Sequence, residues 1–569
     1  MFARILTNCL PIMKPRHAYG FGWSSKKFLL GVALMGALFQ IGCESMHLTR
    51  SAGGMFFNVR KFGAVGDGKN LDSPAINKAI EACARSGGGT VLIPAGTYLS
   101  GSIHLQSNIH LLIDAGATIL GAPQIMNAYD EIEPYSLGGY QDGGHCYFHN
   151  SLIWGENLTN VFITGHGMIN GGGLVRWDRA LNVLCGFTNA PPVPLPTNAD
   201  ATLPPPDVEE PPLSALPDYN TARLGNKAIA LKLCRNVLIR DVTIFHGGHF
   251  AILVTGCDNL TVDNVTMDTD RDGIDIDCCR NTTVSNCRIN SPNDDGLCPK
   301  SSFALGTNVI TENLTIVNCQ VSGFEEGTLL DGTMKPGKGN RTGRIKFGTE
   351  ANGGFRNCTV ANCTFRGCRG LALEEVDGGI MENITINNIA MMDVVHYPIY
   401  ITTGNRDRGP DVATHSRMRN ILISNVIATG VDPMSGIQIT GLPEQPIEGV
   451  RLENIRLEFK GGGTKDDALL VPPELEKVKG RYPEPRRVGV MPGYGLFARH
   501  VKGLELADIN LSFETNDFRP ALACVDVDGL EVDNFKAQLA PGVAAAVMAD
   551  DVRGITIRNS PVLDGINPK

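Results

Sequence analysis

Three aspartates, Asp272, Asp294 and Asp295, are the residues of this chain whose types and spacing most suggest chemistry. Asp272 opens a stretch of acidic and apolar residues, and the Asp294–Asp295 pair follows one repeat period later. In a stack of strands, residues one period apart lie roughly 4.8 Å from each other. Three carboxyl groups this close cannot all ionise freely, so the pKa of at least one is raised. A protonated acid beside ionised bases suits glycoside hydrolysis, whereas a solvated turn or a calcium site also fits the spacing.

The elements that must position these aspartates are short strands that recur along the chain. Each begins with Asn followed by alternating apolar residues, and successive copies lie about 22 to 26 residues apart where no insertion intervenes. Because the copies contain strands and turns but no helix, we expect an all-β solenoid, a right-handed parallel β-helix. Asn at a fixed turn position can take left-handed backbone angles and hydrogen-bond to a neighbouring rung. The repeated unit opens at Asn108, Asn160, Asn236, Asn259, Asn281, Asn313, Asn357, Asn383 and Asn420, and weaker copies open at Gly503, Gly529 and Gly554.

One amphipathic helix is expected ahead of the repeats. Residues 72–86 begin with a capping Asp72 and an early Pro74, and Gly87 follows the pattern. We interpret this helix as an N-terminal cap on the solenoid. Its apolar positions, at helical spacing, are Ile76, Ala79, Ile80 and Cys83.

The composition excludes several classes of protein. The chain has 569 residues, 43% of them hydrophobic, which is too apolar for a disordered protein. A net charge of −9 and the lack of a basic run with interleaved aromatics argue against a nucleic-acid binder. We expect a single β-helix domain over residues 55–569, with surface loops near 190–217, 323–342 and 461–496 that shape a binding face or are inert.

The N-terminus, residues 1–50, resembles an extension followed by an export signal. Lys26 and Lys27 precede an apolar run, residues 28–41, that is too short to favour a spanning helix. The run ends just before Cys43, in a pattern that fits a bacterial lipoprotein signal imperfectly. A lipid anchor at Cys43 and ordinary cleavage nearby both stay open. We expect an exported protein, periplasmic or associated with the bacterial outer membrane.

Sixteen cysteines in an exported protein could form disulfides, but many occupy repeated positions after Asn. Cysteine packs well as a small buried hydrophobe, so we favour stacked free thiols. No spacing of cysteines and histidines suggests a zinc site.

From about Phe56 onward the sequence resembles glycoside hydrolase family 28, the polygalacturonase family of pectin-degrading β-helices. The resemblance begins with Phe62-Gly63-Ala64-Val65-Gly66-Asp67-Gly68 and continues through the Trp154-Gly155-Glu156-Asn157 segment. The family's first site motif, Asn-Thr-Asp before Gly-Ile-Asp, stands here as Asp270-Arg271-Asp272-Gly273-Ile274-Asp275, which keeps the last aspartate, Asp272. Its second motif, an Asp-Asp pair with a following Lys-Ser, stands at Asp294-Asp295 and Lys300-Ser301. This resemblance implies that Asp294 is the general acid and that Asp272 and Asp295 activate water for an inverting displacement. The acid and base sides should then lie roughly 6.5–9.5 Å apart.

Two other family motifs are altered. The family's Gly-His-Gly should fall at Thr342-Gly343-Arg344, where the histidine is absent. The family's Arg-Ile-Lys, which holds a galacturonate carboxylate, should fall at Ala372-Leu373-Glu374, where both cations are absent. The departures indicate either a shifted alignment or a rebuilt subsite.

Other side chains could replace the missing cations. Arg344 and Lys346 alternate with apolar residues and so share one strand face, where an arginine fork could bind a carboxylate. Glu374 would tolerate a neutral sugar such as rhamnose better than a carboxylate. The predicted substrate-binding residues are Lys300, Arg344, Lys346, Glu374 and His249.

We therefore expect a glycosidase of galacturonide or rhamnogalacturonan type, which the long loops could make exo-acting. Its partner would be a pectic polysaccharide or oligosaccharide, with no nucleic acid, no cofactor and no metal, and a monomer is favoured. Two alternatives stay open. One is a calcium-dependent β-helix polysaccharide lyase with Arg344 or Lys346 as base, and the other is a non-catalytic glycan-binding solenoid.

Overall fold

The computed structural model describes residues 56–138, 141, 143–176, 179–185, 220–410 and 415–563. The predicted export signal, Cys43 and the loop near 190–217 lie outside the described residues, so these three calls stay predictions. None of the helices within the described ranges combines the length and the hydropathy that a membrane span requires.

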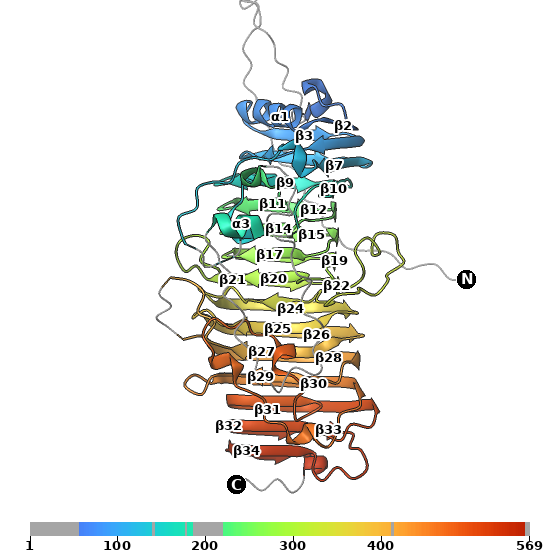
Figure 1. Ribbon diagram of the computed structural model, residues 1–569, viewed down its shortest axis with the longest axis vertical. Helices are drawn as coiled ribbons and strands as arrows, with labels where there is room; N and C mark the ends of the chain where they lie inside the picture. The colour runs from blue at the N-terminus through green and yellow to red at the C-terminus, as the bar shows by residue number, and fades with distance from the viewer. Residues whose placement is uncertain are drawn as a thin grey trace, which may run out of the picture. The chain divides into compact units, whose positions relative to one another are not determined.

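Parallel strands stacked rung upon rung are the main secondary structure of the described chain, which confirms the predicted parallel β-helix (Figure 1). Each early rung contributes three strands, as in β14, β15 and β16, and the next rung repeats them as β17, β18 and β19, with every pair in parallel register. The strands of the first half are β1 (Phe56–Asn58), β2 (Asp67–Leu71), β3 (Gly89–Ile93), β4 (Gly96–Ser100), β5 (Ile103–His104), β6 (Ile109–Ile113), β7 (Ala117–Gly121), β8 (Ser151–Glu156), β9 (Thr159–Thr164), β10 (Met168–Asn170), β11 (Lys227–Lys232), β12 (Arg235–Arg240), β13 (Thr243–Phe245), β14 (Phe250–Thr255), β15 (Asp258–Asp263), β16 (Thr266–Asp268), β17 (Asp272–Asp277), β18 (Arg280–Ser285) and β19 (Arg288–Asn290).

Later rungs have longer strands because two strands that are separate in the early rungs are joined into one continuous strand. These strands are β20 (Leu297–Lys300), β21 (Thr311–Val317), β22 (Gln320–Ser322), β23 (Lys346–Phe347), β24 (Phe355–Arg366), β25 (Arg369–Glu375), β26 (Ile380–Met392), β27 (Val395–Thr403), β28 (Arg417–Val431), β29 (Ile437–Thr440), β30 (Ile447–Gly461), β31 (Leu496–Thr515), β32 (Leu522–Asp533), β33 (Lys536–Ala537), β34 (Val547–Arg553) and β35 (Thr556–Arg558).

The predicted capping helix is confirmed as α1 (Ser73–Arg85), and its predicted apolar positions are all buried in the core. Asp72 acts differently from the prediction. Its side chain does not cap the helix but accepts hydrogen bonds from the backbone N–H groups of Val65 and Gly66, at 2.7 and 3.0 Å. The other helices are α2 (Gly143–Cys146), α3 (Arg179–Leu184) and α4 (Pro485–Val488).

Asparagines at the rung turns form the predicted ladder. Each has a positive φ, from 54° at Asn357 to 63° at Asn108. Their side-chain amides donate to the side-chain Oδ1 of an Asn or Asp in the preceding rung at 2.6 to 3.2 Å. Glycines with positive φ take over this position in the last rungs, which matches the weaker copies in the sequence.

A column of alternating charges runs beside this ladder. Strand register places an acid next to a base at every step, and Glu382 lies 2.7 Å from Arg356 and 2.5 Å from Arg419. Opposite charges on adjacent strands stabilise one register of stacking. The column consists of Arg235, Asp258, Arg280, Glu312, Arg356, Glu382, Arg419, Glu448, Lys502, Asp528 and Arg553.

Every cysteine of the described residues is buried and free of disulfides, as expected. Thiols of successive rungs stack in contact, for example those of Cys234, Cys257 and Cys279.

Candidate active site

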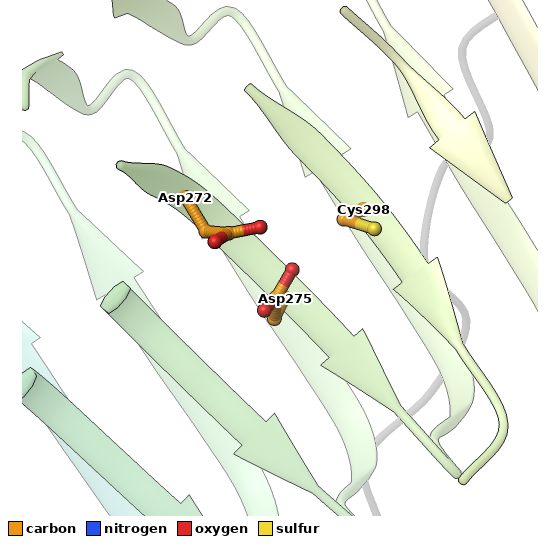
Figure 2. Close-up of side chains that lie close together, drawn as sticks. All are labelled: Asp272, Asp275 and Cys298. Atoms are coloured by element: carbon orange, nitrogen blue, oxygen red, sulfur yellow. The ribbon is translucent and has the colours of Figure 1, made fainter. Parts of the chain in front are cut away.

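Strand β17 brings two acidic side chains to the outer face of the sheet formed by β5, β8, β11, β14, β17 and β20, which we call the site sheet. Ile274 and Ile276 point into the apolar core with 0% exposure, while Asp272 and Asp275 lie on the other face with Cys298 of β20 beside them (Figure 2). Gly273 permits this arrangement, because a Cβ there would lie 2.4 Å from the carbonyl oxygen of Gly296. The motif glycine therefore brings β17 and β20 close together.

The three predicted aspartates converge. One carboxylate oxygen from each of Asp272, Asp294 and Asp295 lies within 4.8 Å of the others. Asp272 and Asp295 are buried, whereas the Asp294 side chain is 27% exposed and faces outward. These oxygens are closer together than the expected 6.5–9.5 Å, because the three residues begin adjacent strands one rung apart.

Asp295 is held ionised by two cations. Arg344 Nε lies 2.6 Å from one oxygen and Lys346 Nζ lies 2.5 Å from the other. Burial alone would raise the pKa of Asp295, but Arg344 and Lys346 lower it below its ordinary value. Arg344 and Lys346 do share a strand face as predicted, and both are engaged by Asp295.

The pKa of Asp272 is shifted in the opposite direction from that of Asp295. Burial, together with the charges of Asp294 and Asp275, raises its pKa well above the ordinary value. Asp294 pairs with Arg271, whose Nη2 lies 2.7 Å from its carboxylate. The trio thus contains a buried acid whose pKa is lowered, a buried acid whose pKa is raised, and a third acid at the surface. The sequence-based expectation that repulsion raises at least one pKa agrees with this pattern.

A buried polar layer supports the site sheet behind the trio. Lys300 Nζ lies 3.0 Å from Glu350, 3.0 Å from Nε2 of His145 and 3.6 Å from Asp275. Burial, partly offset by Lys300, raises the pKa of Asp275 to about 7. Lys300 is itself buried, so it supports Asp275 from within the protein, and its predicted contact with a sugar stays a prediction.

His249 and Glu374 occupy similarly enclosed positions. His249 is buried, with Nδ1 donating to the backbone carbonyl of Arg176 at 3.0 Å. Glu374 has 0% exposure and lies 3.6 Å from Arg344. Among the described residues neither oxygen of Glu374 has a hydrogen-bond partner, and burial raises its pKa to about 7 against the opposing effect of Arg344. The substrate-binding roles of both residues stay predictions.

The loop of residues 461–496 reaches the site from the C-terminal rungs. Tyr482 lies with its hydroxyl 3.0 Å from Lys346 Nζ, and Glu484 lies 2.7 Å from Nη1 of Arg369. Helix α4 continues the loop, and its Arg486 donates to Asn340 of the loop 323–342 at 3.1 Å. The two loops therefore meet beside the trio.

Carboxylate spacing alone would allow a cation in two places. These are the trio itself and the group of Asp272, Asp275 and Cys298 in Figure 2. In both groups, however, a carboxylate is already compensated by a nearby cation, since Asp295 pairs with Arg344 and Lys346, and Asp275 lies near Lys300. The chain's own cations thus balance the charge that a bound metal would otherwise balance.

Four site residues were missed by sequence reasoning. Glu350 carried a signal, because it directly follows Gly348-Thr349 of the altered third motif. The sequence contained no such signal for His145, Tyr482 and Glu484, because each of these residues reaches the site on a segment outside the repeats.

Comparisons with known proteins give families and relatives to which this chain is similar. A family model described as "Rhamnogalacturonase A/epimerase, pectate lyase-like" matches residues 56–183, and one described as "Glycosyl hydrolases family 28" matches residues 217–474. A probable polygalacturonase from Vitis vinifera is 24% identical, over 71% of this chain and 74% of the relative. An exo-poly-alpha-D-galacturonosidase from Dickeya chrysanthemi is 24% identical, over 68% of this chain and 64% of the relative.

Solved structures share the fold. An exopolygalacturonase from Thermotoga maritima superposes with a TM-score of 0.54 at 22% identity, covering 71% of this chain and 87% of its own. A family 28 exopolygalacturonase from Yersinia enterocolitica gives a TM-score of 0.57 at 18% identity, covering 90% and 80%. The family model over residues 217–474 assigns this part of the chain to family 28 of the glycosyl hydrolases, and the solved structures show that the chain has a right-handed parallel β-helix fold.

Proposed function

We propose that this chain hydrolyses glycosidic bonds of pectic polysaccharides or oligosaccharides with Asp272, Asp294 and Asp295. The observation that carries the proposal is the convergence of these carboxyl groups within 4.8 Å, where burial raises the pKa of Asp272 and, against the effect of burial, Arg344 and Lys346 lower the pKa of Asp295. Hydrolysis of a glycosidic bond needs a proton for the leaving oxygen and an ionised group that activates water.

Exposure supports the assignment of roles. Asp294 faces outward and is the general acid, while the buried Asp272 and Asp295 orient the attacking water. Carboxyl oxygens of Asp272 and Asp294 lie within 4.8 Å of each other, so a proton can pass from Asp272 to Asp294 before the bond is cut. One water at hydrogen-bond distance from two oxygens spans up to about 5.6 Å, which is enough to bridge this pair.

Two segments enclose the trio, which supports action at a chain end. On the rungs before β17, Phe148 covers the outer face of the site sheet together with Phe250, and His145 packs against Phe250 at 4.8 Å. On the following rungs Tyr482 covers Lys346. A substrate confined between two such walls enters as an end rather than lying across an open groove.

The charge arrangement supports a rebuilt subsite. At the position where the family places Arg-Ile-Lys, this chain places a buried Glu374 that lies 3.6 Å from Arg344 and whose oxygens have no hydrogen-bond partner among the described residues. Such a carboxyl group can form hydrogen bonds with sugar hydroxyl groups, and it lacks the positive charge that would hold a uronate. We therefore propose a neutral sugar at this subsite, as a rhamnogalacturonan-type substrate would supply.

A lyase mechanism is the second candidate, and the ion pairs count against it. Its base would be Arg344 or Lys346, which would have to lose a proton. Burial opposes the charge of each residue, but Asp295 outweighs that effect and raises both pKa values well above their ordinary values. A side chain held protonated in this way cannot abstract a proton.

Product chemistry tests the proposal. We would incubate the chain with polygalacturonate, with rhamnogalacturonan and with oligosaccharides of each, and identify the new ends by mass spectrometry. Proton NMR in the first minutes gives the anomer released. The family resemblance makes inversion the expected outcome, and retention, which the short carboxylate spacing would also suit, would overturn that part of the proposal. A hydrolase gives no ultraviolet-absorbing product and tolerates a chelator. An unsaturated product that disappears with chelation would establish the lyase instead.

A further inference from the structure

The loop 461–496 is attached to the site through two of the site's own cations. Tyr482 contacts Lys346, which in turn holds Asp295, and Glu484 contacts Arg369. The side chains of Arg369 and Glu484 are only 3% and 6% exposed. The loop thus buries polar groups that a substrate would have to reach.

The Arg369–Glu484 pair leaves hydrogen-bonding capacity unused. Within the described residues, Nε of Arg369 and Oε1 of Glu484 have no hydrogen-bond partner. A guanidinium binds a carboxylate best through two parallel bonds, and a buried ion pair with unpaired atoms is a weak source of stability. Arg369 is therefore poised to exchange this carboxylate for a better-placed one.

Register places Arg369 within reach of a bound chain. It begins β25, which pairs with β23, and β23 continues the site sheet through the bridge between Leu297 and Ile345. Arg369 thus lies two rungs beyond Asp295, or about 10 Å along the stack. A substrate extending from the trio past Glu374 would pass this residue.

We propose that the loop 461–496 is a lid whose Glu484 occupies, in the free chain, the position on Arg369 that a uronate carboxylate of the substrate takes when the lid opens. The inference rests on the proposed pectic substrate and adds a carboxylate subsite to it. A neutral sugar at Glu374 and a uronate at Arg369 together match an alternating chain. Because a uronate can take Arg369 only in the open state, the apparent affinity for a charged ligand is reduced by the fraction of molecules that are open. A ligand without a carboxyl group does not need Arg369 and binds with the lid open or closed.

Binding of a matched pair of ligands tests the proposal. The probes are a rhamnose–galacturonate disaccharide and the same disaccharide with its carboxyl group reduced, each titrated by calorimetry. Glu484→Gln keeps the size of the side chain and removes its charge, which favours the open lid. We expect its Kd for the charged probe to fall about tenfold, with the Kd for the reduced probe unchanged. Arg369→Gln should lose the preference for the charged probe.

Glu476→Gln is the control. Glu476 lies in the same loop and pairs with Arg499 at 3.0 Å, with side-chain exposures of 6% and 4%, so the two ion pairs are matched in burial. This variant should bind both probes as the wild type does. Equal tightening by Glu476→Gln, or no tightening by Glu484→Gln, would overturn the proposal.

Hydrogen exchange gives a second readout that needs no substitution. The charged probe should speed amide exchange in residues 461–496 of the wild type, while the reduced probe should not. Unchanged or slower exchange there would contradict the lid. Turnover on pectic substrates separates this result from the proposed function. Turnover without the binding changes refutes the lid alone, and the binding changes without turnover on any pectic substrate refute the proposed hydrolysis alone.

Discussion

Replacing Glu374 with Gln should remove part of the pH dependence of folding stability. The Glu374 carboxyl group is fully buried, and its pKa rises from the ordinary 4.5 to about 7, chiefly through burial. Between these two pH values the folded chain binds a proton that the unfolded chain has released. Stability from this group is therefore full below about pH 4.5 and falls as the pH rises towards 7.

The size of the effect follows from the pKa. At about 1.4 kcal/mol for each pH unit, the wild type should lose about 3 kcal/mol relative to Glu374→Gln between pH 4.5 and pH 8. Denaturant unfolding of both proteins at these two pH values measures the difference. Glu514→Gln, at an exposed position of β31, is the control and should follow the wild type. If the stability difference between wild type and Glu374→Gln is the same at both pH values, Glu374 is not a buried, proton-binding carboxyl group and the argument for a neutral-sugar subsite fails.

Three further substitutions test other parts of the structure. Asn383→Ala removes a left-handed turn residue that forms hydrogen bonds with Asn357 and Asn420. It should lower the free energy of unfolding by about 1–3 kcal/mol. An unchanged denaturant midpoint would show that the asparagine ladder does not stabilise the fold. Glu382→Lys places a cation between Arg356 and Arg419 and should destabilise the folded chain by about 1 kcal/mol. Adding Arg419→Glu to this variant should restore part of the lost stability. Absence of this rescue would show that the charge column does not stabilise the register. Lys346→Met removes one of the two cations that lower the pKa of Asp295. The acidic limb of the pH profile of kcat/KM should therefore move to higher pH. An acidic limb that does not move would show that ionisation of Asp295 does not control catalysis.

The solenoid was predictable from the sequence because each rung repeats the same local sequence pattern. Asn at the turn, alternating apolar residues and a fixed period are visible without any long-range information, and the same period placed Asp272 beside Asp294 and Asp295. Stacked thiols were predictable for the same reason. Contacts between neighbouring rungs can therefore be predicted from the spacing of residues in the sequence.

The partners of those carboxylates were harder to predict. Arg344 and Lys346 were expected to meet substrate, yet they compensate Asp295, because a buried carboxylate needs a counter-charge nearby. Tyr482 and Glu484 reach the site on a loop whose path is set by tertiary contacts rather than by the repeat. The separation of acid and base was expected from the general mechanism and came out shorter in the structure, since strand stacking sets it.

The most direct test of the central claim compares Asp294→Asn with Asp272→Asn on two substrates. One is the natural pectic oligosaccharide, and the other is an aryl glycoside whose nitrophenol leaves without protonation. Loss of the general acid should cost roughly 10²–10⁴-fold in rate on the natural substrate. The account predicts that Asp294→Asn recovers most of its activity on the aryl glycoside, whereas Asp272→Asn remains impaired on both substrates. Recovery by Asp272→Asn alone would make Asp272 the acid, and full activity of Asp294→Asn on the natural substrate would contradict the proposed mechanism altogether.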